Sequence, residues 1–446
     1  TIFSVIATIG VPTGVQRFLG KLFAEQKIQD ANVFIKSSLV LVTIGLFACL
    51  ILIIITKDFF HNIFNYHHSL MLVFFVLIIS LSMYNLFRSI IISSLKTRML
   101  PIITLVSTSL KIVLGIILVL TGMGVLGMTI GFILFPILAS ILFFITLKSI
   151  LRSTENRSDI KIKNSIKETL SSSLANWIPT LVTTIGSQLG TIIVFGSQGA
   201  SHAGIYFIAF SIFTAIAAIT SVLLSISYPA LSAMKDGRKT FAWRVTKMSL
   251  IATLPISTSI IFYSRDIMHL FGQEYVDGAI SLQLLLVSSL PAVVTSGINS
   301  LIYSRGNYKQ VLVMGLASSI PRVLLYFILV PVYGSTGAAI SYTAGSFFGF
   351  VISVLFARTV GLKIFWKELF LILIVPTGLG FVLSYAGINY VVGIVITCIV
   401  SCILYVKMQI ITRNDIHDSI SGLPSKIANP TLRILNNIAK KLNEHF

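Results

Sequence analysis

Charged residues are scarce in this 446-residue chain, at 11% of the sequence, and acids are scarcer than bases, with 14 Asp and Glu against 33 Lys and Arg. Soluble globular domains carry about 25% charged residues, so this shortage excludes a soluble fold. Hydrophobic residues make up 55% of the chain and recur in runs of about twenty, the length that crosses a hydrocarbon core of about 30 Å. The sequence therefore predicts an all-α polytopic membrane protein.

Cysteine is also rare. Cys49, Cys398 and Cys402 all lie inside apolar runs, which excludes a disulfide framework, and no acid or histidine in the last run completes a zinc ligand set. The chain has no Walker A motif and is therefore not itself an ATPase. We expect neither a metal nor a cofactor.

Thirteen transmembrane spans are predicted from the apolar runs, at residues 1–16, 32–56, 69–92, 102–121, 125–147, 173–197, 203–228, 248–264, 279–302, 310–331, 336–357, 369–387 and 390–410. Of the 33 Lys and Arg, 29 fall in alternate loops and the tail, two in the opposite loops and two inside spans. Because Lys and Arg collect in cytoplasmic loops, the split places the C-terminus in the cytoplasm. It also explains the net charge of +19 without a nucleic-acid partner.

An odd number of spans with a cytoplasmic tail places Thr1 outside, and the sequence has no initiator Met and no signal peptide. We therefore expect that one N-terminal span is missing from this sequence and that the whole protein has fourteen. On that basis the visible spans are helices 2 to 14. The predicted location is the cytoplasmic membrane of a bacterium or an archaeon.

Two halves are predicted from a repeat. At a constant offset of 210 residues, Gly124 matches Gly334 and Gly127 matches Gly337, so the unit of helix 5, turn and helix 6 recurs as helices 11 and 12. We expect two six-helix lobes related by a pseudo-two-fold axis along the membrane normal. The predicted divisions are an N-terminal lobe at 1–147, a cytoplasmic linker at 148–172, a C-terminal lobe at 173–357, helices 13 and 14 at 358–411, and a tail at 412–446. The end of the tail has the pattern of an amphipathic helix on the inner leaflet or of a frayed terminus.

Acids are absent from the middle of every predicted span, whereas two spans carry a base, Lys111 in helix 5 and Arg322 in helix 11. A base at the bilayer centre costs about 2.5–3.5 kcal/mol. With no acid to pair with, each base is expected to face a wet cavity between the halves, where it would prefer an anion; the alternative is that the side chain snorkels to the interface. The two positions differ by one residue in the repeat, which rotates a helical side chain by about 100°.

Four further residues are candidates for substrate binding. Arg17 and Arg88 lie at the cytoplasmic ends of helices 2 and 4, where the alternative is an ordinary interfacial anchor. Asn176 and Gln188 belong to helix 7, which is unusually polar for a span, and we expect them to line a cavity or to bond neighbouring helices.

Four segments resemble one family. "GVPTGVQRFLGKLFAEQ" (10–26) resembles the end of helix 2 in polysaccharide and oligosaccharide flippases, and "YPALSAMKDGRKTF" (228–241) the end of their helix 8. "IMHLFGQEYVDGAISLQLLLV" (267–287) is similar to their helix 9–10 loop, and "LVPVYGSTGAAISYTAGSFF" (329–348) to their helix 11–12 turn. These lipid-linked O-antigen-type flippases belong to the multidrug/oligosaccharidyl-lipid/polysaccharide exporter superfamily.

The resemblance implies a transporter with two lobes, alternating access and no enzymatic step. Its substrate would be a polyprenyl-phosphate- or pyrophosphate-linked oligosaccharide, its other partners membrane lipids and glycan assembly proteins, and its state a monomer. A cation-coupled multidrug antiporter of the same superfamily is the first alternative, although such exporters commonly use intramembrane carboxylates. A membrane glycan polymerase or ligase is the second, although the outer loops are short for one.

Overall fold

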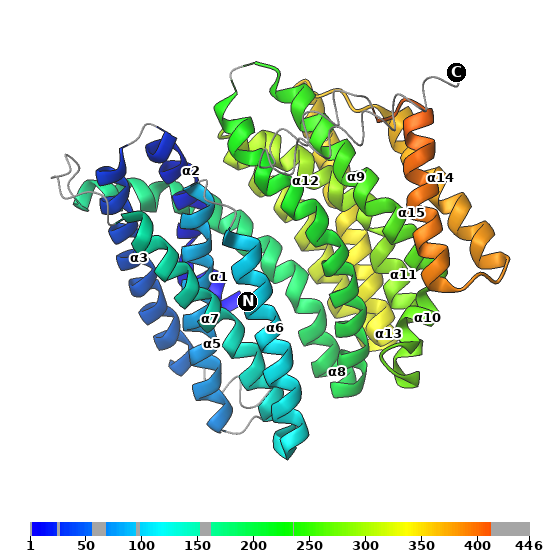
Figure 1. Ribbon diagram of the computed structural model, residues 1–446, viewed down its shortest axis with the longest axis horizontal. Helices are drawn as coiled ribbons and strands as arrows, with labels where there is room; N and C mark the ends of the chain where they lie inside the picture. Colours follow the sequence, from blue (N-terminus) through cyan, green and yellow to red (C-terminus); the bar gives the residue numbers. More distant parts are fainter. Residues whose placement is uncertain are drawn as a thin grey trace. The chain divides into compact units, whose positions relative to one another are not determined.

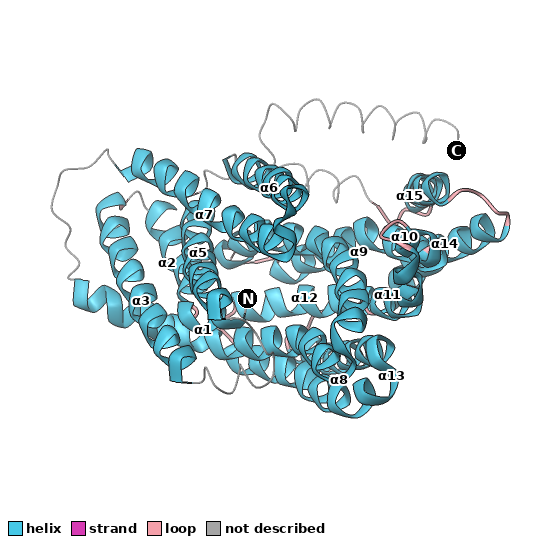
Figure 2. Cartoon of the chain, turned by 90° about the horizontal axis from the view of Figure 1, so that it is seen from below, coloured by secondary structure: helices cyan, strands magenta, loops and turns pink. Residues whose placement is uncertain are grey.

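The computed structural model describes residues 2–24, 27–55, 68–94, 99–151, 162–234 and 236–411, and within these ranges the chain is helical with short turns and no strand (Figures 1 and 2). The helices are α1 (Ile2–Thr8), α2 (Val11–Ala24), α3 (Ile28–Ile55), α5 (His68–Ser93), α6 (Met99–Leu118), α7 (Gly124–Leu151), α8 (Ile162–Ala233), α9 (Arg238–Phe262), α10 (Ser264–His269), α11 (Ala279–Val287), α12 (Ser289–Ser304), α13 (Tyr308–Thr359), α14 (Trp366–Tyr385) and α15 (Tyr390–Lys407), with a π-helical turn η1 (Val119–Met123) and a 3₁₀ turn η2 (Gln273–Gly278). The all-α fold class is confirmed.

Ten helical segments of the described residues are long and apolar enough to cross a membrane. Two of them are double, because α8 is interrupted by non-helical backbone at Gly199 and α13 at Gly334. Each double segment corresponds to two predicted spans, so the twelve spans predicted from 32–56 onward all have a helical counterpart.

The first predicted span, 1–16, is not one continuous helix. The backbone has positive φ at Ile9 (+48°) and Gly10 (+69°), and α1 and α2 meet at this turn. A Cβ at Gly10 would lie 2.6 Å from the carbonyl oxygen of Ser173 and 2.9 Å from the Cβ of Trp177. The turn therefore depends on glycine for both its conformation and its close approach to α8. Hydropathy alone did not reveal this break.

The chain divides into two compact units, Thr1–Ile185 and Gly186–Phe446. The division falls inside α8, later than the predicted linker at 148–172. The first part of α8 packs with unit 1: Trp177 Nε1 donates a hydrogen bond of 2.9 Å to the carbonyl of Val5 on α1. Both ends of the predicted linker are helical, whereas residues 152–161 and the tail at 412–446, with its predicted amphipathic helix, lie outside the described residues.

Unit 1 is built around the contacts of α5 with α2 and α7, and of α6 with α7. Its core contains Val15, Leu86, Ile90 and Phe143. The outer side of α3 is equally apolar, with Ile55 73% exposed. A helix that is apolar on every side suits a bilayer rather than water, which agrees with the composition.

Unit 2 packs α12 between α9 and α13, with α14 and α15 against α9 (Figure 1). Its core contains Leu250, Val294 and Leu301. Several buried hydroxyls bond within the spans: Thr258 donates to the carbonyl of Leu254 at 2.8 Å, and Tyr405 to that of Ile372 at 2.7 Å. This internal bonding is required where no water is present.

The repeat found in the sequence is visible in the backbone. Gly124 has φ +50° and ψ −127°, and Gly334 has φ +53° and ψ −128°, a conformation open essentially only to glycine. The second pair of matched glycines also corresponds, because a Cβ at Gly127 would collide with Leu118 and one at Gly337 with Leu329. Both units therefore turn at the equivalent glycine, although unit 1 has an additional π-helical turn with positive φ at Gly122.

Candidate functional site

Arg322 lies on α13 in unit 2 and is only 6% exposed. One wall of its surroundings comes from α8, whose "GSQLG" segment spaces Gly186 and Gly190 four residues apart. A Cβ at Gly186 would lie 2.7 Å from Ser319 Oγ, and one at Gly190 would lie 3.0 Å from Tyr326 Oη. These small residues let α8 approach the face of α13 that brackets Arg322.

The second wall comes from the far half of α13, beyond the break at Gly334. Its "GSFFG" segment places Gly345 and Gly349 against Ser318 and Arg322: a Cβ at Gly345 would lie 2.6 Å from Arg322 Cβ, and one at Gly349 would lie 2.8 Å from Ser318 Cβ. Arg322 is thus enclosed by two small-xxx-small faces, a packing mode typical of membrane helices.

The guanidinium of Arg322 makes two specific contacts. Its Nη2 donates to Ser346 Oγ at 3.1 Å, and its Cζ lies 3.9 Å from the centroid of the Tyr342 ring. The ring is held from other sides by Phe210 and Phe213, with centroids at 5.4 and 5.3 Å. Within the described residues, Arg322 has no carboxylate partner and its buried Nε has no acceptor. The site therefore holds a fixed positive charge with an unused donor.

Two buried tyrosines extend the polar part of this site. Tyr206 and Tyr326 are both 0% exposed, and their hydroxyl oxygens would lie 2.9 and 3.0 Å from a Cβ at Gly190. The hydroxyls therefore converge on the same glycine of α8, one helical turn along α13 from Arg322. Sequence reasoning missed these tyrosines together with Tyr342 and Ser346; the two glycine pairs, each with a spacing of four residues, are the signal that could have located this face.

Lys111, the predicted counterpart of Arg322, lies on α6 in unit 1 and is half-buried. Its Nζ lies 4.2 Å from the centroid of the Phe132 ring. Phe132 and Tyr342 are separated by the repeat offset of 210, so both bases lie over a ring at the same repeat position. The one-residue difference between the bases does not prevent this shared contact.

The other candidates are dispersed. Arg88 is exposed on α5, and Gln188 is half-buried on α8, roughly 160° around the helix axis from the glycine face that meets α13. The side chains of Arg17 and Asn176 lie outside the described ones. Arg322 and Gln188 belong to unit 2 and Lys111 and Arg88 to unit 1, and the role of these residues in binding remains a prediction.

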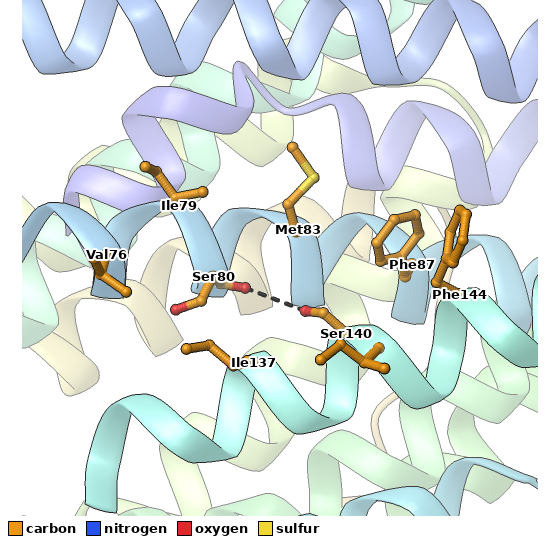
Figure 3. A pocket seen from close by; sticks show the side chains of 9 residues that line it. Val76, Ile79, Ser80, Met83, Phe87, Ile137, Ser140 and Phe144 are labelled. Carbon is orange, nitrogen blue, oxygen red and sulfur yellow. Dashed lines mark hydrogen bonds between the residues drawn. The ribbon is translucent and has the colours of Figure 1, made fainter. Parts of the chain in front are cut away.

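An apolar cavity of about 470 Å³ lies between α5 and α7 in unit 1 (Figure 3). Its walls include Val76, Met83 and Phe144, and its polar atoms come from Ser80 and Ser140, whose Oγ donates to the carbonyl of Ser80 at 3.4 Å. It contains none of the predicted site residues, and its lining suits hydrocarbon. In the part of the chain that the structure describes, no group of His, Cys, Asp and Glu could hold a metal.

The chain matches one known protein family and is similar in fold to several solved membrane transporters. A family model described as "Polysaccharide biosynthesis protein" matches residues 1–280, and no curated protein matches the chain. The lipid II flippase MurJ in an inward closed conformation is 17% identical, with 91% of this chain and 93% of that chain covered and a TM-score of 0.64. The MATE transporter VcmN of Vibrio cholerae is 13% identical, with 81% and 87% covered and a TM-score of 0.64.

A MOP superfamily transporter from Pyrococcus furiosus is 17% identical, with 80% of this chain and 84% of that chain covered and a TM-score of 0.60. At these identities the likeness establishes the fold, which is that of polytopic membrane transporters. The family match covers more than half of the chain. The chain therefore belongs to the polysaccharide biosynthesis protein family.

Proposed function

We propose that this protein is a flippase that moves a polyprenyl-phosphate- or pyrophosphate-linked oligosaccharide across the cytoplasmic membrane. The observation that carries the proposal is Arg322: a buried base in a membrane span, with no carboxylate partner among the described residues and with an unused Nε. Membership in a polysaccharide biosynthesis family supports a glycan-linked substrate, and the MurJ-like fold supports a flippase.

The interaction energies at Arg322 favour a site that binds an anion. Placing the base in the membrane costs about 2.5–3.5 kcal/mol. The stacking of the desolvated guanidinium on the Tyr342 ring offsets about 2 kcal/mol of this cost. The hydrogen bond to Ser346 contributes a further amount of about 1.5–3 kcal/mol. These contacts hold Arg322 in place, but the unpaired Nε still costs about 1–3 kcal/mol. A phosphate oxygen would relieve that cost, and arginine suits phosphate because its donors form a planar fork.

Transport requires that the site open. Arg322 is 6% exposed, so a headgroup reaches it only when the glycine faces that cover α13 separate. Small-residue faces pack closely without interlocking long side chains, and we propose that they separate when the site opens. We propose that opening toward one membrane face at a time carries the headgroup across while the polyprenyl tail stays in the bilayer, and that the apolar cavity of unit 1 accommodates hydrocarbon.

The proposed function also gives roles to the other candidate residues. Lys111, Arg17 and Arg88 would supply further positive charge to the phosphate, and Asn176 and Gln188 would bond the sugar. The protein would act as a monomer without catalysing a chemical reaction, with its C-terminus in the cytoplasm and glycan assembly proteins as partners.

Proteoliposomes test the proposal. The purified chain is reconstituted with a fluorescently labelled polyprenyl-pyrophosphate oligosaccharide, and translocation is followed by quenching of the outer leaflet. Arg322→Ala should lower the flipping rate about 10- to 100-fold, the range expected for one charged hydrogen bond, and Arg322→Lys should retain part of it. Arg265→Ala, which removes an exposed base elsewhere in unit 2, is the matched control. Full flipping by well-folded Arg322→Ala would contradict the role of the buried base.

A cation-coupled multidrug antiporter is the second candidate, because the chain shares the fold of MATE transporters. The same proteoliposomes, loaded with a cationic dye under a sodium or proton gradient, separate the two functions. Gradient-driven dye efflux without glycolipid flipping would replace the flippase proposal, whereas flipping without dye efflux would support it.

A further inference from the structure

A basic cavity separate from the Arg322 site lies at the turn that joins α13 to α14. It has a volume of about 500 Å³ and is lined by Arg358, Lys363, Phe365 and Trp366 together with turn residues. One membrane-spanning segment ends at Thr359 and the next begins at Trp366. The cavity, named here the α13–α14 pocket, therefore lies at the membrane–water boundary, on the side rich in Lys and Arg.

The charge around this pocket is positive and unneutralised. Arg358 and Lys363 are exposed and, within the described ranges, neither has a carboxylate partner. Lys239 adds a third base, because a Cβ at Gly361 would lie 2.7 Å from its Nζ. The turn thus gathers basic side chains from α9 and α13 and from its own residues.

The acid nearest in sequence does not neutralise them. Glu368 accepts a hydrogen bond of 3.2 Å from Trp243 Nε1 at its Oε2, and the same oxygen lies 3.9 Å from Lys247 Nζ. This carboxylate is engaged with α9, so the field at the pocket remains attractive to an anion.

The backbone of the turn is fixed. Gly361 has φ +68°, Gly361 N donates to the carbonyl of Arg358 at 3.0 Å, and Leu362 N donates to that of Ala357 at 2.8 Å. Arg305 Nη1 donates to the carbonyl of Val360 at 3.2 Å. The helix end is therefore capped internally, and the bases project from a preorganised scaffold.

An apolar surface adjoins the basic one. Phe365 and Trp366 are 48% and 52% exposed, and Leu355 on α13 and Phe370 on α14 are 49% and 61% exposed. Tryptophan favours the headgroup region of a bilayer, and the exposed aliphatic and aromatic side chains continue from the pocket along both helices. The combination suits a ligand with an anionic head and hydrocarbon tails.

We propose that the α13–α14 pocket binds the phosphate headgroup of an anionic phospholipid, with the acyl chains along α13 and α14. Arg358 and Lys363 bind the phosphate, Lys239 contributes to the field, and Trp366 lies against the glycerol region. This site shares no residue with the Arg322 site, and it does not depend on the flippase function.

Native mass spectrometry tests the site. The full chain is incubated with defined lipids in detergent, the detergent is removed in the gas phase, and the lipid that stays bound is measured. Phosphatidylglycerol should stay bound in preference to phosphatidylcholine. The double variant Arg358→Ala/Lys363→Ala should weaken phosphatidylglycerol binding about 10- to 30-fold. The matched control Arg265→Ala/Lys309→Ala removes one Arg and one Lys that are also exposed and should leave binding unchanged. The charge-preserving variant Arg358→Lys/Lys363→Arg should retain most of the binding, which separates charge loss from misfolding.

Competition identifies the source of the phosphate. Inorganic phosphate should displace phosphatidylglycerol poorly, because it lacks acyl chains, and a polyprenyl phosphate should compete less well than phosphatidylglycerol itself. Equal binding of phosphatidylcholine, equal loss in the control variant, or preferential binding of polyprenyl phosphate or free phosphate would each overturn the proposal.

Discussion

The two repeat units both place a base over an aromatic ring, and they differ in how completely the pair is enclosed. In unit 1, Lys111 lies over Phe132, which is 43% exposed. In unit 2, Arg322 lies over Tyr342 and is itself only 6% exposed. The rings occupy equivalent repeat positions, so the shared backbone fixes where a base can stack, and local side chains decide whether it is buried.

The sequence difference behind this contrast lies one turn beyond the ring. Gly345 in unit 2 packs directly against Arg322, whereas the repeat position in unit 1 carries Phe135. Ser346 accepts a hydrogen bond from Arg322, whereas its counterpart is Pro136, which has no side-chain acceptor. A glycine that lets the helices approach and a serine that fixes the guanidinium therefore turn a surface pair into an enclosed site.

Substitution of the turn glycines should have the largest effect on stability, because each glycine lets the two helices of its own repeat pack closely. A Cβ at Gly337 would collide with the carbonyl group of Leu329, and one at Gly127 would lie 2.8 Å from the carbonyl carbon of Leu118. We expect Gly337→Val and Gly127→Val each to lose more than about 4 kcal/mol of stability and to yield little monodisperse protein on size exclusion. Gly378→Val, at a helical glycine with no atom within 4 Å of its Cβ position, is the control. Normal yield of both turn variants would show that the turns are not rigid.

The next largest effect is expected at the two bases, whose substitution should change the rate of transport rather than the stability of the fold. Arg322→Ala should reduce glycolipid flipping about 10- to 100-fold, whereas Lys111→Ala, at a half-buried position, should reduce it only several-fold. Replacing a buried charge by an apolar side chain of similar volume is often close to neutral for stability, so the control Arg322→Met should match Arg322→Ala in flipping while its melting temperature changes little. The comparison with unit 1 is between the two alanine variants. Equal loss of flipping in both variants would remove the functional difference between the two pairs.

Much of this architecture was predictable from sequence, because apolar runs of twenty residues and matched glycines are strong local signals. The helical fold, twelve of the spans and the turns at Gly124 and Gly334 follow from them. The enclosure of Arg322 by Gly345, Ser346 and the Tyr342 ring was not predicted. Lipid and protein interior are equally apolar, so hydropathy does not reveal which side of a membrane helix faces a neighbour. The break at Gly10 was missed because it depends on a close approach of α8.

The glycines with matched dihedral angles allow a direct comparison of the two turns. Alanine at Gly124 or Gly334 would meet little steric obstruction, with nothing within 4 Å of the first and only Gln198 and His202 side-chain atoms beyond 3.5 Å at the second. The cost is then the backbone conformation alone, about 1–3 kcal/mol. We expect Gly124→Ala and Gly334→Ala to destabilise by the same amount in thermal unfolding. A difference above about 1 kcal/mol would show that the two turns contribute unequally to the free energy of unfolding.

The aromatic rings should give the smallest effects and the sharpest comparison. Tyr342→Leu removes the ring from a desolvated cation and should cost about 2 kcal/mol, whereas Phe132→Leu acts at a partly exposed pair and should cost about 0.5–1 kcal/mol. Tyr342→Phe keeps the ring and should leave both the melting temperature and flipping unchanged. If Tyr342→Phe were as damaging as Tyr342→Leu, the hydroxyl rather than the ring would be the important group. The contrast between the units would then rest on hydrogen bonding to the substrate and not on the stacking that both repeats share.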